Sequence, residues 1–164
     1  MTRAYLGLGS NAGDREANLA AAVEALAGAG LTVVARASLY ETAPQGEVLD
    51  QPDFLNSAVA VETSLAPLEL LDVCKRIERA LGREPGGVRH GPRPIDIDVL
   101  LVGDETLASD RLTLPHPEIA TRRFVIEPLL ELDPDLALPD GRRVDSFLDG
   151  LGGQRVERLE PRGG

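Results

Sequence analysis

The stretch GPRPIDIDVLL, residues 91–101, changes from a loop rich in glycine and proline into a run of alternating isoleucine and aspartate. Side chains two positions apart in a strand point to the same side, so Asp96 and Asp98 share one face. The other face is apolar and carries Ile95, Ile97 and Val99. The pattern predicts a strand over residues 95–102 with one buried and one polar face.

This strand completes a series of elements that lies upstream of it. In chain order, the patterns predict a strand at 3–9, a helix at 17–26 capped by Asp14, strands at 31–40 and 54–63, and a helix that starts within 64–67 and ends at Gly82. No helix separates the two middle strands, so they are expected to be antiparallel or paired at a distance. The order βαββαβ predicts an α+β, ferredoxin-like fold, with two helices on one face of a four-stranded antiparallel sheet.

The chain continues beyond this core. A turn at Gly103 and Asp104, a short helix over residues 124–132 and a C-terminal extension are predicted. With 164 residues, 43% of them hydrophobic, the chain can bury one substantial core, so residues 1–164 are expected to form a single domain. Residues 152–164 are rich in glycine and arginine and are expected to form a loosely packed tail.

The charge and the single cysteine narrow the class of protein. The chain has 27 acidic and 17 basic residues and a net charge of -10, which argues against binding to nucleic acid or to an anionic membrane. The N-terminus shows no charged leader followed by an apolar segment, and no apolar run is long enough to span a membrane. Cys74 cannot form an intrachain disulfide and is interpreted as a small core residue. A cytoplasmic protein is therefore expected.

Asp96 and Asp98 are the first candidates for chemistry. Two adjacent carboxylates repel each other unless a cation lies between them, and Mg²⁺ is commonly held by one or two carboxylates together with phosphate oxygens. The alternative is that they form the solvated face of an antiparallel strand.

Basic residues lie on either side of this strand in the sequence. The Gly/Pro-rich loop before it contains Arg83, Arg89 and Arg93. One arginine side chain can bind two phosphate oxygens at once, in a bidentate contact. His116 lies between two prolines after it, with Arg111, Thr113 and Arg122 nearby. These residues could meet an anionic triphosphate; exposed loop arginines and an ordinary surface histidine are the alternatives.

Two of the five aromatic residues, Phe54 and Phe124, flank predicted loops and could stack on a flat heterocycle. Asn56 is two positions after Phe54, points to the same side of its strand and could bind a ring edge. Ordinary core packing is the alternative for each ring.

A competing signal is GLGSNA, residues 7–12, which fits the loose dinucleotide fingerprint G-x-G-x-x-A. That fingerprint needs parallel strands and an acidic residue about 20 positions later, whereas position 32 is Thr. No GxxxxGK[ST] phosphate loop is present either.

Several segments together resemble the 6-hydroxymethyl-7,8-dihydropterin pyrophosphokinase family of folate biosynthesis. They are YLGLGSN (5–11), YETAPQG (40–46), QPDFLNSAV (51–59), Ile77 with Glu78, GPRPIDIDVLL (91–101), LPHP (114–117) and RRF (122–124). Their order and spacing carry the resemblance over most of the chain.

The resemblance implies roles for individual residues. Asp96 and Asp98 would bind two Mg²⁺ ions that bridge the phosphates of ATP. Phe54 and Phe124 would enclose the pterin ring, with its edges bound by Asn56, Thr42, Ala43 and Gln45. Contacts to the nucleotide would come from Lys75, Arg83, Arg89, Arg93, Val99, Arg111, Thr113, His116 and Arg122, with Arg83 and Arg93 acting in catalysis. In the loop, Pro85 and Gly86 replace basic residues and His90 replaces a tryptophan.

The resulting hypothesis is a monomeric, magnesium-dependent enzyme that transfers diphosphate from ATP to the pterin alcohol and releases AMP, without nucleic-acid or membrane partners. In-line attack on the β-phosphorus would be aided by closure of the loops at 42–53 and 82–94. Two alternatives are a ligand-binding regulatory module on the same scaffold and a different transferase that uses an Asp-x-Asp pair.

Overall fold

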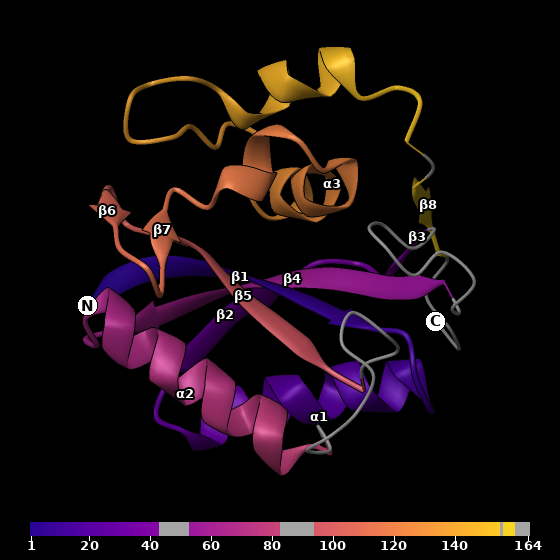
Figure 1. Ribbon diagram of the computed structural model, residues 1–164, viewed down its shortest axis with the longest axis vertical. Coiled ribbons are helices and arrows are strands. Elements are labelled where there is room, and N and C mark those ends of the chain that lie inside the picture. The colour runs from indigo at the N-terminus through magenta and orange to yellow at the C-terminus, as the bar shows by residue number, and fades with distance from the viewer. Residues whose placement is uncertain (43–52, 83–93, 155, 160–164) are drawn as a thin grey trace.

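The computed structural model describes residues 1–42, 53–82, 94–154 and 156–159. Its centre is a six-stranded antiparallel sheet, in which three long strands lie side by side: β5 (Asp96–Val102), β1 (Thr2–Ser10) and β4 (Phe54–Thr63). Three shorter strands, β2 (Thr32–Arg36), β3 (Tyr40–Thr42) and β8 (Val156–Arg158), lie beyond β4. The order β5-β1-β4-β3 confirms the ferredoxin-like α+β prediction (Figure 1).

The predicted strand at residues 31–40 is two strands in the structure. β2 pairs with the second half of β4, and β3 pairs with its first residues. Between them, the backbone N–H and the Oγ of Ser38 both donate to Glu131, each at 2.9 Å. The prediction of one continuous strand was wrong because this partner lies 93 positions later in the chain.

Two helices, α1 (Arg15–Gly28) and α2 (Pro67–Ala80), cover one face of the sheet (Figure 1). Asp14 caps α1 as predicted, since its side chain accepts a hydrogen bond from the N–H of Ala17 at 3.1 Å. Pro67 is tolerated in the first turn of α2, where its missing N–H leaves no helical bond unmade. A fully buried core forms between helices and strands from residues that include Leu6, Leu19, Leu26, Leu70, Ile95 and Ile97.

The opposite face of the sheet carries a second layer that the two-helix prediction lacks. It contains α3 (Arg123–Leu132), close to the helix expected at 124–132, and two 3₁₀ helices, η1 (Pro117–Ala120) and η2 (Val144–Gly150). This layer is needed because β4 is buried along nearly its whole length on both faces. Its core includes Ala58, Leu100, Ile126, Leu129 and Val144.

The remaining chain connects and extends these layers. The turn at Gly103 and Asp104 is present as predicted and leads into a small ribbon of β6 (Leu107–Ala108) and β7 (Thr113–Leu114). Within the predicted loose tail, β8 pairs with β3, so residues 156–158 extend the sheet by one edge strand. Among the described residues, no helix is long and apolar enough to cross a membrane.

Candidate active site

Asp96 and Asp98 lie on β5, the outermost of the long strands. Ile95, Ile97 and Val99 are buried in the core beneath α1 and α2, whereas both aspartates remain partly exposed. The alternation predicted from the sequence is therefore confirmed. The two carboxylates face the side of the sheet that carries η1 and α3.

The adjacent strands connect the aspartate pair to the predicted ring-binding residues. On β1, Gly9 lies opposite Asp96 on one side and opposite Asn56 of β4 on the other. Neighbouring strands are about 4.8 Å apart, so β5 and β4 are separated by roughly 9.6 Å across β1. An ideal Cβ on Gly9 would lie 3.0 Å from Asn56 Oδ1, which places the open side of Gly9 on the same face as that amide.

His116, the N-cap of η1, and Glu118, within η1, approach Asp98 from the second layer. One donor atom each from Asp98, His116 and Glu118 lies within 4.8 Å of the other two. His116 Nδ1 accepts a hydrogen bond from the N–H of Glu118 at 3.1 Å, and burial lowers the pKa of the imidazole. A neutral imidazole with this bond carries its proton on Nε2, which can donate to a phosphate oxygen.

Without a bound cation, this cluster brings several carboxylates close together. Burial, followed by the negative charges of Asp96 and Glu118, raises the pKa of Asp98 to about 8. A set of carboxylate oxygens that resists ionisation so strongly is suited to a hard divalent cation, whose charge would favour the ionised form. The donor set therefore fits Mg²⁺.

The residues predicted to bind a ring edge lie together at the start of β4. Phe54 pairs with Thr42 of β3, and Asn56 is buried two positions later. The Nδ2 of Asn56 donates to Thr42 Oγ1 at 2.7 Å, which fixes the amide. Phe124 lies on α3 at the margin of the second core, partly exposed. Ala43 and Gln45 lie outside the described residues.

The predicted nucleotide-binding residues divide over the two sides of β5. Arg122 lies 3.9 Å from Glu118 and so belongs to the side of the aspartates and His116. Arg111 forms an ion pair with Asp72 of α2, and Lys75 of α2 lies 3.3 Å from Glu78. Val99 is buried in the core near α2, and Thr113 is exposed on β7. Arg83, Arg89 and Arg93 lie outside the described residues, as do Pro85, Gly86 and His90.

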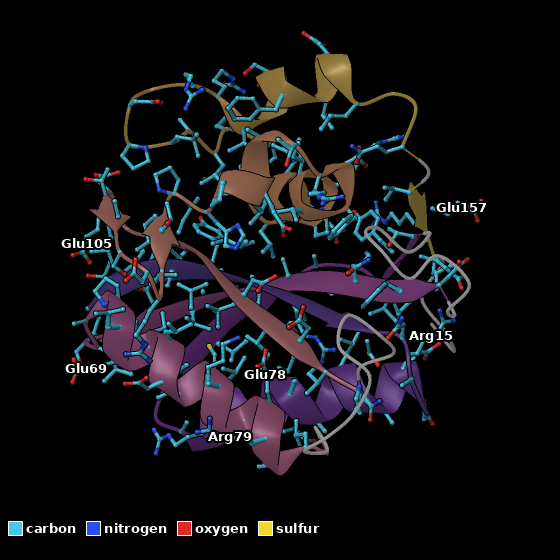
Figure 2. The ribbon with its side chains drawn as sticks, viewed as in Figure 1. Arg15, Glu69, Glu78, Arg79, Glu105 and Glu157 are labelled. Carbon is cyan, nitrogen blue, oxygen red and sulfur yellow. The ribbon has the colours of Figure 1, made fainter. Side chains whose placement is uncertain are left out.

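Sequence reasoning missed one residue of this site and named two others without predicting their contacts. Glu118 was not singled out, although its place two residues after His116 was available as a signal. Gly9 was predicted to lie in the strand at 3–9, which the structure confirms, but it was not predicted to contact the ring-binding residues. Glu78 was named among the segments that carry the resemblance, and the structure shows it fully buried on α2 (Figure 2). It accepts a hydrogen bond at 2.7 Å from the N–H of Ile97, the residue between the two aspartates.

Comparisons with known proteins show which family the chain belongs to. Residues 5–134 match the model of the 7,8-dihydro-6-hydroxymethylpterin-pyrophosphokinase family. The chain belongs to this family. It is 51% identical over 161 residues to the 2-amino-4-hydroxy-6-hydroxymethyldihydropteridine pyrophosphokinase of Methylorubrum extorquens, covering 98% of this chain and 100% of that protein. The enzyme of the same name from Pseudomonas aeruginosa is 42% identical over 158 residues, covering 96% of each chain.

Solved structures support the fold. The crystal structure of wild-type Plasmodium falciparum HPPK-DHPS with SDX-DHP superposes with a TM-score of 0.69 over 92% of this chain, at 17% identity. This chain spans 44% of the length of that chain. Membership of the family makes the protein a pyrophosphokinase of folate biosynthesis, with ATP as its co-substrate.

Proposed function

We propose that this chain, as a single domain and a cytoplasmic monomer, transfers the diphosphate of ATP to the hydroxymethyl group of 6-hydroxymethyl-7,8-dihydropterin, with two Mg²⁺ ions held by Asp96 and Asp98. One observation carries the proposal: a carboxylate pair on β5 is separated by the single strand β1 from a buried, fixed amide on β4. The separation of roughly 9.6 Å suits an alcohol that is bound by its ring at one end and reacts at the other.

The aspartates account for the metal requirement. Their shared face, partial exposure and raised Asp98 pKa all favour a bound cation over a bare pair of charges. When bound there, magnesium neutralises negative charge on the phosphate oxygens. Glu118 lies close enough to Asp98 to add to the attraction for the cation.

The residues of β3, β4 and α3 would hold the pterin. Asn56 is fixed by Thr42, so it can bind the polar edge of the ring without first losing side-chain freedom. Phe54 and Phe124 would stack on the two faces of the ring, and Ala43 and Gln45 would bind its edge.

The transfer itself needs positioning and charge neutralisation. The hydroxymethyl oxygen attacks the β-phosphorus, the bond from that phosphorus to the α-phosphate oxygen breaks, and AMP leaves while the hydroxyl proton passes to solvent. The Nε2 of His116 would donate to a phosphate oxygen, and Arg122 would exchange Glu118 for phosphate. Arg83 and Arg93 would neutralise the transferred group, and Lys75, Arg89, Val99, Arg111 and Thr113 would complete the nucleotide site.

The proposal is tested by replacing the carboxylates. Asp96→Asn and Asp98→Asn should each lower AMP formation from ATP and the pterin by at least about 100-fold, because each removes a charged metal ligand. Asp104→Asn changes an exposed aspartate in the turn after β5 and serves as the matched control. Wild-type turnover in the Asp98 variant would contradict the assignment of the metal site.

A further inference from the structure

We propose that Gly9 is required for tight binding of the pterin, because a side chain at this position would press on the Asn56 amide that binds the ring edge. The inference rests on the proposed function and adds a positioning residue to it. Gly9 is the β1 residue in register with both Asp96 and Asn56, so its backbone lies between the metal pair and the ring-binding amide.

The backbone conformation of β1 does not require a glycine at position 9. Gly9 lies in a regular strand and lacks the positive φ seen at Gly13, Gly30, Gly82, Gly103 and Gly141. A glycine inside a strand costs about 0.5–1 kcal/mol relative to alanine. Such a residue commonly marks a place where a ligand or another backbone approaches closely.

The side-chain atoms nearest to Gly9 belong to the predicted ring-binding residues. An added Cβ would lie 3.0 Å from Asn56 Oδ1 and 3.7 Å from Phe54 Cδ1, which are atoms of two predicted ring-binding residues. Asn56 cannot retreat freely, because its Nδ2 is bonded to Thr42 and the residue is buried. A methyl group at position 9 would therefore push on the amide and displace it from the position in which it binds the ring edge.

Gly7 provides an internal comparison on the same strand. A Cβ there would meet Leu100 Cδ1 at 3.3 Å, and Leu100 is buried in the second core. Gly7 lies opposite Asp98 on β5, but the atoms that its Cβ would meet are all those of Leu100, whereas the atoms facing Gly9 are those of Asn56 and Phe54. Gly7→Ala is the matched control for Gly9→Ala.

The test measures binding of 6-hydroxymethylpterin by calorimetry in the presence of Mg²⁺ and a non-hydrolysable ATP analogue. Gly9→Ala should raise the pterin Kd at least about tenfold, which corresponds to about 1.4 kcal/mol. The Kd of the ATP analogue should stay within about twofold of the wild-type value. Gly7→Ala should leave the pterin Kd within about threefold of wild type.

A double substitution separates this explanation from a general loss of folding. In an Asn56→Ala background the 3.0 Å contact is gone, so adding Gly9→Ala should change the pterin Kd much less than it does in the wild type, and the double variant should fold even if Gly9→Ala alone does not. Unchanged pterin binding in Gly9→Ala, or an equal loss in Gly7→Ala, would overturn the inference. A wild-type protein that binds no pterin at all would instead refute the proposed function.

Discussion

Replacing Asp98 with asparagine should stabilise the metal-free protein while it abolishes transfer. Burial and the charges of Asp96 and Glu118 raise the pKa of Asp98 from its usual 3.8 to about 8. The folded state therefore holds this proton to a higher pH than the unfolded chain does, and the free energy of unfolding falls as the pH rises from about 4 through about 8. Asparagine has nearly the same shape but does not titrate, so it removes this loss.

The structure sets the size of the effect. At about 1.4 kcal/mol for each pKa unit, the interval from 3.8 to about 8 gives an upper limit of about 6 kcal/mol at pH 9. Asp98 is partly exposed, and water and counter-ions screen its charge. We therefore expect the variant to be more stable by about 2 kcal/mol at pH 9.

Urea unfolding in EDTA at pH 6 and pH 9 measures this difference, with Asp104→Asn as the control. With Mg²⁺ present the wild type should be the more stable protein, because the ion binds its folded state and binds the folded Asp98 variant only weakly. The reasoning is refuted if the Asp98 variant is no more stable than the control at pH 9, or if wild-type stability does not fall between the two pH values.

Substitutions at Glu78, Glu131 and Asp14 test three further contacts of the fold by urea unfolding. Glu78→Ala should cost about 3 kcal/mol, because it leaves the buried N–H of Ile97 without its acceptor, and Glu78→Gln should recover most of the loss; equal losses would contradict this role. Burial opposes the charge of Glu131, but hydrogen bonds from Tyr40 and Ser38 more than offset it and lower the pKa, so Glu131→Gln should destabilise at pH 7 and much less below about pH 4. Asp14→Ala should cost about 1 kcal/mol, and no loss would argue against the cap of α1.

The sequence predicted the parts of the fold that local patterns determine. Alternation of isoleucine and aspartate placed Asp96 and Asp98 on the polar face of β5, and the cap at Asp14 marked the start of α1. Cys74 is a core residue as predicted, and burial raises the pKa of its thiol to about 12.

The rest depends on contacts between distant segments. The break between β2 and β3 follows from the hydrogen bonds of Ser38 to Glu131, and the second layer follows from burial of both faces of β4. The site also depends on contacts between distant segments. Glu118 lies near Asp98 because η1 folds over β5, and Gly9 contacts the ring-binding residues because it lies in register with Asn56. None of these relations is visible in a window of a few residues.

The most direct measurement of the central claim uses ATP labelled with ³²P at the γ-phosphate. The purified protein is incubated with this ATP, Mg²⁺ and 6-hydroxymethyl-7,8-dihydropterin, and the products are separated and identified by mass. Diphosphate transfer predicts a labelled pterin diphosphate together with an equal amount of AMP. Neither product should form in the presence of EDTA. Formation of ADP with a pterin monophosphate, or AMP without a labelled pterin, would contradict the account.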